Sequence, residues 1–443
     1  MSDYRALLLT DVVDSTKLSE HLGNEAMAGV WAAHDRVARD LLRAHGGREI
    51  DKTDGMLMMF DYATDAVDFA LAYHRALAVL PVPLKARAGL HVGPVILREN
   101  AAADVALGAK PLEVDGIAKP TAARVMALAN GGQLLLTTEA VESLGKTMLR
   151  VRSHGHWLMK GLAEPVELFE VNAHDAAFAV PAGADKARRV VQSGGRWVAV
   201  DELPNNLPQL ATNFIGRERE LAEVKALLDK TRLLTLLGMG GLGKTRLSLQ
   251  VAAEVRHRFP DGVWFIDLAP LRDPALVAGE VAQVLDIRDE PGRPLLQTVC
   301  AALRSRTLLL ILDNCEHLLA AAGELANAVL RAAPNLRVLA SSREALHVPG
   351  EQIVPILPLQ LPRPGDAVDA LADATAVRLF IDRARLQRPD FAFTPQEAPA
   401  IAELVTRLEG IPLALELAAA RVRMLSVAEI NARLKDRYKL LTG

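Results

Sequence analysis

The sequence predicts an α+β domain, followed by an α/β domain built around a phosphate-binding loop, and then an all-α subdomain. Three observations favour this order. Short apolar runs alternate with amphipathic stretches up to about residue 172, and apolar runs alternate with helical stretches from about residue 207. Beyond about residue 366 the chain is rich in Ala and Leu and has no strand pattern. The length of 443 residues agrees with about three domains of roughly 150 residues each.

The composition is that of an ordinary globular protein, with 50% hydrophobic and 24% charged residues. A net charge of −3 and 4% aromatic residues provide neither a basic surface nor stacking rings, so we expect no direct nucleic-acid binding by this segment. No apolar stretch reaches the roughly 18 residues of a membrane span, and Asp11 and Asp14 interrupt any signal-peptide core. We therefore expect a cytoplasmic protein without membrane partners.

The first domain is expected over residues 1–172. Its β-like runs are at 5–13, 55–60, 86–97 and 131–138. Its amphipathic helices are expected at 24–44 and 63–79. Residues 173–206 lose this periodicity and gather Gly, Pro, Ala and Asn. Such a composition is typical of a connecting segment, so a domain boundary is expected there.

The second domain is expected over residues 207–365, and a helical subdomain over residues 366–443. A short helix at 217–229 precedes a series of apolar runs. We expect these runs to be strands, at 232–238, 263–268, 307–313 and 336–342. Apolar strands separated by helices predict a parallel sheet that is covered on both faces.

A glycine-rich loop follows the first of these strands. Residues 238–245 read GMGGLGKT, the complete G-x-x-x-x-G-K-[ST] pattern between a strand and a helix. Its glycines let successive backbone N–H groups face an anion, and they are Gly238, Gly240, Gly241 and Gly243. Lys244 can then reach the outer phosphates, and the Thr245 hydroxyl can ligate Mg²⁺. The loop predicts binding of ATP or ADP with Mg²⁺.

Three charged residues follow the later strands of this domain. Asp313 ends one strand at the sheet edge where ligands bind, which suits a Walker B carboxylate that holds Mg²⁺ opposite Thr245. Glu316 either polarises the attacking water or is a carboxylate favoured at a helix start, and both interpretations stay open. Arg343 follows the next strand, where order and spacing favour a sensor of the γ-phosphate over an ordinary exposed arginine.

Five segments in order resemble the NB-ARC/STAND family of signalling ATPases, specifically its bacterial regulators of the LuxR and AfsR type. They are NFIGRE at 213–218, GMGGLGKTRL at 238–247, LLLILDNCEHL at 308–318, LASSREAL at 339–346 and GIPLALEL at 410–417. The resemblance implies that Phe214, Ile215 and Arg217 close over the adenine and that Pro412 touches it. It also implies a closed state held by ADP, an oligomerising state opened by ATP, and slow hydrolysis. Family members usually continue into a winged helix and sensor repeats.

Two N-terminal carboxylates could bind divalent cations. Asp11 ends an apolar strand, and Asp54 lies in the turn between two strands. Acids on adjacent strands could hold a pair of cations that bind a triphosphate. From spacing alone, turn and cap carboxylates are the better explanation.

The surrounding sequence resembles the catalytic domain of class III nucleotidyl cyclases over about residues 1–172. The segments are LLLTDVVDSTKLSEHLG, GGREIDKTDGMLMMF, RAGLHVGPV, AARVMALANGGQLLLT and GHWLMKGLAEPVELFEV. The resemblance implies a ferredoxin-like fold and a site shared by two subunits. It assigns Asp11 and Asp54 to two Mg²⁺ or Mn²⁺ ions, adds the Val12 carbonyl as a further ligand, and makes Arg124 the arginine that stabilises the pentavalent phosphate.

Several positions depart from the cyclase pattern. Pro120 stands where the transition-state asparagine is expected, and it offers neither a side-chain amide nor an N–H. Lys52 is the candidate base-reading lysine in a segment one residue short, and either Glu113 or Asp115 could be the base-reading acid. Losing a transition-state donor typically costs about 10²–10³ in rate, so we expect low, Mn²⁺-favoured, dimer-dependent cyclase activity or none.

The leading hypothesis is a signalling protein in which a nucleotide-switched ATPase is coupled to a cyclase-like homodimer domain, with a higher oligomer in the ATP state. One alternative is an active adenylate or guanylate cyclase regulated by a P-loop domain that does not hydrolyse. Another is an assembly module of a transcription regulator without turnover.

Overall fold

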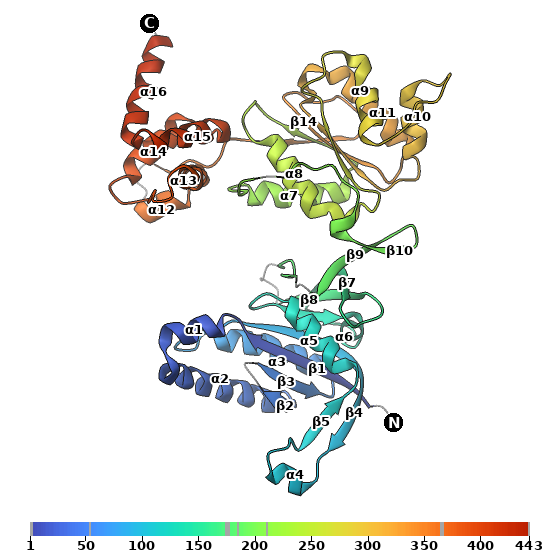
Figure 1. Cartoon of the computed structure of the whole chain (residues 1–443), viewed down its shortest axis with the longest axis vertical. Coiled ribbons are helices and arrows are strands. Elements are labelled where there is room, and N and C mark those ends of the chain that lie inside the picture. Colours follow the sequence, from blue (N-terminus) through green and yellow to red (C-terminus); the bar gives the residue numbers. More distant parts are fainter. Residues whose placement is uncertain are drawn as a thin grey trace. The chain divides into compact units, whose positions relative to one another are not determined.

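The computed structural model describes residues 3–52, 55–172, 178–183, 186–209, 211–363 and 367–441. The chain divides into two compact units, Met1–Asp201 and Glu202–Gly443. Figure 1 labels many of the elements of unit 1 (Met1–Asp201) and unit 2 (Glu202–Gly443). In the part of the chain that is described, no helix has the length and apolar character needed to cross a membrane.

Unit 1 is an α+β domain on a large mixed sheet, as the periodicity predicts. Its elements are β1 (Asp3–Val12), α1 (Ser15–Leu22), α2 (Asn24–Ala44), β2 (Arg48–Lys52), β3 (Met56–Phe60), α3 (Ala63–Ala78), β4 (Ala86–Glu99), α4 (Ala102–Ala106), β5 (Leu112–Asp115), α5 (Ala118–Leu128), β6 (Leu134–Thr137), α6 (Thr138–Glu142), β7 (Arg150–Met159), β8 (Val166–Asn172), β9 (Ala187–Ser193) and β10 (Arg196–Ala199). The strand order is β10-β9-β7-β8-β6-β4-β1-β3-β2, and β5 pairs with β4.

Alternating side chains on β1 fill cores on both faces of this sheet. Leu8 packs in a cluster with Ala38 of α2 and Phe69 of α3. Leu7 points to the opposite face, where its cluster includes Ala122 of α5. Because α2 and α3 lie on one face and α5 on the other, β1 is held in the middle of the sheet and its C-terminal end is fixed in place.

The expected connecting segment 173–206 contains a β-hairpin in its described part. Strand β9 pairs with β7 from His156–Val190 to Met159–Ala187, and β10 pairs with β9. Gly194 and Gly195 form the turn with φ of 55° and 77°, the backbone that a two-residue hairpin turn requires. Two of the residues that suggested a linker, Gly194 and Gly195, therefore form a hairpin turn, and the hairpin belongs to unit 1.

Unit 2 begins with an α/β domain on a parallel sheet, as predicted. Its strands are β11 (Leu233–Leu237), β12 (Val263–Asp267), β13 (Leu309–Asp313), β14 (Arg337–Ser342) and β15 (Glu351–Pro355), in the order β12-β13-β14-β11-β15. Its helices are α7 (Glu218–Lys230), α8 (Lys244–Val255), α9 (Val277–Val284), α10 (Leu295–Leu303) and α11 (Leu319–Ala332). The edge strand β15 was not expected from the sequence.

Both faces of the sheet in unit 2 are covered. Leu310 of β13 packs in a cluster with Val281 of α9 and Leu325 of α11. Its neighbour Ile311 packs on the other face with Val251 of α8. This burial on both sides explains the uninterrupted apolar character of the strands. It also directs all the carboxyl ends of the parallel strands to one sheet edge, the edge that carries the phosphate loop.

The regular elements among the described residues after β15 are helices. The helices are α12 (Val368–Asp373), α13 (Thr375–Gln387), α14 (Ala398–Arg407), α15 (Pro412–Ala419) and α16 (Val427–Leu441). They bury a core of their own around Phe380, Ile401 and Leu415. Leu413 at the start of α15 donates its N–H to the Gly241 carbonyl at 3.1 Å, so this helical part contacts the glycine-rich loop directly.

Candidate functional site

The N-terminal candidate site lies where β1 ends. Asp11 accepts two hydrogen bonds from Arg87 of β4, from Nη2 at 2.6 Å and from Nε at 2.8 Å. The two residues face each other in the register of β1 and β4, as do Val12 and Ala86. Asp54 lies outside the described residues. In this arrangement the charge of Asp11 is balanced by Arg87. A metal ion at Asp11 would have to displace Arg87 or share the carboxylate with it.

The residue after Asp54 packs tightly on β1. A Cβ on Gly55 would stand 1.7 Å from the Thr10 carbonyl oxygen, so only glycine fits at this crossing. The Met56 N–H donates to the Thr10 hydroxyl at 3.2 Å. The start of β3 is therefore fixed against the end of the strand that carries Asp11.

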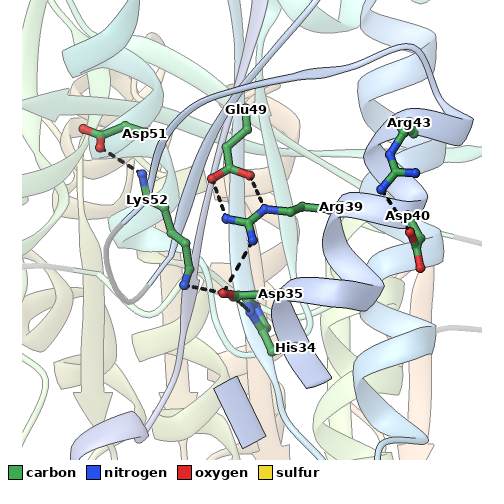
Figure 2. A network of polar contacts seen from close by, with 8 residues as sticks. All are labelled: His34, Asp35, Arg39, Asp40, Arg43, Glu49, Asp51 and Lys52. Atoms are coloured by element: carbon green, nitrogen blue, oxygen red, sulfur yellow. Dashed lines mark hydrogen bonds and ion pairs between the residues drawn. The ribbon is translucent and has the colours of Figure 1, made fainter. Parts of the chain in front are cut away.

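Lys52 is engaged within its own chain (Figure 2). Its ammonium lies 2.6 Å from the Asp35 carboxylate of α2. Burial opposes ionisation of Asp35, but hydrogen bonds from Lys52 and His34 lower the pKa of its carboxyl overall. Asp51 in turn forms an ion pair with Lys110. A base-reading role for Lys52 would require breaking the ion pair with Asp35.

Arg124 of α5 lies near a different turn from Asp11. Its Nη1 donates to the Pro120 carbonyl at 3.2 Å, and a Cβ on Gly161 would come within 2.8 Å of its Nη2. Among the described residues no hydrogen bond or ion pair joins Arg124 to Asp11. The two predicted residues are thus not brought into contact within one subunit.

The glycine-rich loop of unit 2 joins β11 to α8. Gly241 and Gly243 have φ of 80° and 83°, which L side chains rarely adopt. The helix begins at Lys244, whose ammonium donates to the Gly238 and Met239 carbonyls at 2.7 and 3.0 Å. Burial lowers the pKa of Lys244, and the negative charge of the nearby Glu316 carboxylate opposes this shift. The lysine thus curls back over its own loop, where phosphates would compete for its donors.

Asp313 and Thr245 meet at the carboxyl edge of the sheet. The Thr245 hydroxyl donates to Asp313 Oδ2 at 2.7 Å, and the Ser341 hydroxyl donates to Oδ1. Asp313 is 1% exposed, and this burial raises the pKa of its carboxyl. The predicted pairing of the Walker A hydroxyl with the Walker B carboxylate is present in the fold.

Glu316 and Arg343 complete the predicted cluster. Arg343 Nε lies 3.2 Å from Glu316 Oε1, while Glu316 Oε2 is shielded from solvent and has no hydrogen-bond partner among the described residues. A Cβ on Gly240 would stand 3.2 Å from Arg343 Nη2, so the guanidinium lies against the loop. Glu316 therefore lies beside Arg343, close to the glycine-rich loop.

The donor set fits Mg²⁺. Two oxygen groups 2.7 Å apart, from Thr245 and Asp313, can belong to one small cation shell, and oxygen is the ligand type that Mg²⁺ prefers. No group of three or more His, Cys, Asp or Glu side chains gathers for a metal anywhere in the described ranges.

Comparison with known families gives a match within unit 2. Residues 217–321 match the model of the NB-ARC domain. This part of the chain is similar to NB-ARC domains. The match begins at Arg217 and includes the glycine-rich loop, Lys244, Thr245, Asp313 and Glu316.

Relatives of known sequence include several regulators. An uncharacterised protein of Mycobacterium tuberculosis is 40% identical over 232 residues, which are 52% of this chain and 56% of that protein. A protein of the same organism named as an HTH-type transcriptional regulator is 41% identical over 220 residues, 50% of this chain and 24% of that protein. Regulatory protein AfsR of Streptomyces griseus is 26% identical over 255 residues, 54% of this chain and 24% of AfsR. The chain thus spans about half or less of the length of these relatives.

Solved structures similar to part of the chain include nucleotidyl cyclases. A Trypanosoma brucei adenylate cyclase in its monomeric state is 22% identical with a TM-score of 0.37, covering 41% of this chain and 93% of that one. The guanylyl cyclase Cya2 is 22% identical with a TM-score of 0.35, covering 41% and 98%. No role of any residue follows from these scores. The predicted resemblance of the second unit to NB-ARC regulators of the AfsR type is confirmed.

A pocket lies beside the glycine-rich loop of the NB-ARC domain, between it and the helical part. Phe214, Ile215 and Pro412 line it, together with Arg217, Leu242, Gly243, Arg246, Leu359, Leu379, Arg383 and Glu416. The predicted adenine contacts are thus gathered at one place. Arg217 is 4% exposed, and its guanidinium donates to the Leu242 and Leu357 carbonyls at 2.9 and 2.7 Å. Its hydrogen bonds hold the walls of the pocket together.

Three charged residues at this pocket were not expected from the sequence. Arg246 donates to the Asn213 carbonyl at 2.7 Å, and Arg383 of α13 donates to the same oxygen at 2.9 Å. Glu416 of α15 accepts from Arg383 at 2.9 Å and lies 3.8 Å from Arg246. Arg246 directly follows the loop motif and could have been noticed, whereas Arg383 carries no sequence signal. Together they fasten Asn213 to both α8 and α13.

Proposed function

We propose that the chain is a cytoplasmic signalling protein whose NB-ARC unit binds ATP or ADP, hydrolyses ATP slowly and uses the difference between the two nucleotides as a switch. One observation carries the proposal. The Thr245–Asp313 hydrogen bond of 2.7 Å joins the loop to the Walker B strand, with Lys244, Glu316 and Arg343 around it. Such a group of residues is what phosphoryl transfer requires, namely positioning and charge stabilisation.

Each residue of this cluster has a task in the proposed reaction. The loop N–H groups and the N-terminus of α8 bind the phosphates, and Lys244 exchanges its two carbonyl acceptors for phosphate oxygens. Thr245 and Asp313 would hold Mg²⁺, which neutralises charge on the phosphates when bound. Glu316 orients the attacking water through its unpartnered Oε2. Arg343 leaves Glu316 to contact the γ-phosphate, so only ATP engages it.

The switch proposal rests on the pocket between the glycine-rich loop and the helical part. The base would lie between Phe214 and Ile215 on one side and Pro412 on the other. A nucleotide there would stabilise the closed arrangement, and Arg343 would report the γ-phosphate that distinguishes ATP from ADP. A ligand can shift such an equilibrium only by its differential affinity for the two states. We propose that the ATP state opens and forms a higher oligomer.

The N-terminal unit is proposed to be a cyclase-like homodimer module of low activity. Asp11 is occupied by Arg87, Lys52 is occupied by Asp35, and Pro120 stands in place of the transition-state amide. These contacts support a regulatory dimerisation role over an efficient cyclase. Two Mg²⁺ or Mn²⁺ ions could still bind at Asp11 and Asp54 in a dimer.

The test compares two variants of the whole chain. Phosphate release from ATP and nucleotide-dependent mass by light scattering are measured for the wild type, for Lys244→Ala and for Asp11→Ala. We expect Lys244→Ala to abolish both signals and Asp11→Ala to leave both unchanged. Formation of cyclic nucleotide and pyrophosphate by the wild type, lost in Asp11→Ala and without release of phosphate, would instead support the cyclase as the output enzyme. Assembly without any phosphate release would support a switch without turnover.

A further inference from the structure

Asn314, directly after the Walker B carboxylate, has an unusual backbone conformation. Its φ of 59° lies in the left-handed region, which asparagine tolerates better than most residues. Its N–H donates to the Ser341 hydroxyl at 3.1 Å, and that hydroxyl in turn donates to Asp313. The backbone N–H of Asn314 therefore belongs to the hydrogen-bond network around Asp313.

The Asn314 side chain lies between two carboxylates. Its Nδ2 donates to Asp313 Oδ2 at 3.1 Å and lies 3.4 Å from Asp267 Oδ1. Asp267 and Asp313 end the neighbouring strands β12 and β13 and face each other in the parallel register. Two carboxylates so placed repel each other, and the two N–H donors of one amide offset this repulsion.

The two carboxylates differ in their surroundings. Asp313 is 1% exposed and shares its oxygens with Thr245 and Ser341, whereas Asp267 is exposed at the sheet edge. Asp267 Oδ1 also accepts from the Ala269 N–H at 3.0 Å, which fixes the direction of the carboxylate. An exposed, oriented carboxylate next to a buried one is suited to accept hydrogen bonds from water around a cation.

We propose that Asp267 is a further residue of the magnesium site, where it accepts from metal-bound water, and that Asn314 is the positioning residue that holds it there. This inference rests on the proposed nucleotide function. Mg²⁺ retains several waters when it binds proteins, so acceptors beyond its direct ligands influence its affinity. Removing such an outer partner typically costs about 10–100-fold in metal affinity.

The test titrates Mg²⁺ into the whole chain and a fluorescent ADP analogue, after EDTA has removed all Mg²⁺. It measures the Mg²⁺ concentration that gives half of the full increase in affinity for the analogue. Asp267→Asn and Asn314→Gly are compared with wild type. Glycine keeps the left-handed backbone and removes only the amide, so a backbone effect is separated from a side-chain effect. Asp273→Asn is the matched control, because Asp273 makes the same turn bond, to the Ala275 N–H at 2.9 Å, in the loop beyond β12.

We expect both variants to raise the half-saturating Mg²⁺ concentration about tenfold or more. Affinity in EDTA should stay unchanged, the double variant should lose little beyond the larger single effect, and Asp273→Asn should match wild type. A change below threefold in Asp267→Asn, or an equal loss of affinity in EDTA, would overturn the inference while leaving the proposed function intact. Absence of nucleotide binding by the wild type would overturn both.

Discussion

Arg383 offers a quantitative test of how the nucleotide pocket is closed. The residue is 6% exposed and joins the helical part to the 213–215 segment through the Asn213 carbonyl at 2.9 Å. Replacing it by alanine removes one buried charge-assisted hydrogen bond, worth about 1.5–3 kcal/mol. It also removes the ion pair with Glu416, worth about 1 kcal/mol because that carboxylate is one-third exposed.

The sum of about 3 kcal/mol corresponds to roughly a 100-fold shift between the closed and open arrangements. Arg246 still holds the Asn213 carbonyl at 2.7 Å, so part of this effect will be compensated. We therefore expect Arg383→Ala to weaken ADP binding at least tenfold and to increase hydrogen exchange across residues 211–217.

Arg385→Ala is the matched control on the same helix. Arg385 is exposed and makes one bond of 3.3 Å to the Phe391 carbonyl, away from the pocket. Its removal should leave ADP affinity unchanged. ADP binding by Arg383→Ala within threefold of wild type, with unchanged exchange at 211–217, would refute the reasoning.

Three further predictions follow from other parts of the chain. Gly410 has φ of 64°, and a Cβ there would stand 2.4 Å from the Leu359 carbonyl oxygen, so Gly410→Ala should destabilise unit 2 by about 2 kcal/mol or more in thermal unfolding. Gly350→Ala, with φ of 84° and open space around it, should cost only the backbone strain of about 1 kcal/mol. Burial lowers the pKa of His74 to about 4, so the folded state binds its proton less readily than the unfolded state does. The free energy of unfolding of unit 1 should thus fall by about 3 kcal/mol between pH 6.5 and 4, and His74→Phe should remove this part of the pH dependence in urea titrations. Cyclic nucleotide formation should be low, favour Mn²⁺ and vanish in Asp11→Asn, whereas robust turnover with Mg²⁺ and ATP would contradict the low-activity assignment.

Much of the fold follows from local patterns in the sequence. The apolar runs that became β11, β13 and β14 were predicted because a strand buried on both faces must be apolar throughout. Strand β15 was missed because it lies at an edge, begins with Glu351 and Gln352 and ends at Pro355, so it has neither a long apolar run nor a clear alternation. The β9–β10 hairpin was missed because its glycines also suit a flexible linker.

The contacts in the candidate sites also divide into those that the sequence predicts and those that depend on the tertiary fold. Thr245 and Asp313 could be paired in advance because parallel strands end at one edge, beside the loop that follows β11. The partner of Asp11 could not be predicted, because Arg87 faces Asp11 only through the register of β1 and β4. No local sequence pattern determines that register. The ion pair of Arg383 with Glu416 likewise depends on how α13 and α15 pack.

Calorimetric titration of the whole chain with ADP and with ATP, in the presence of Mg²⁺, tests the central claim most directly. We expect one nucleotide per chain in the wild type. Lys244→Ala should weaken binding about thirtyfold or more, because the ammonium loses its charge-assisted bonds to phosphate. A wild-type chain that binds neither nucleotide, or a Lys244→Ala variant that binds both as tightly as wild type, would contradict the account.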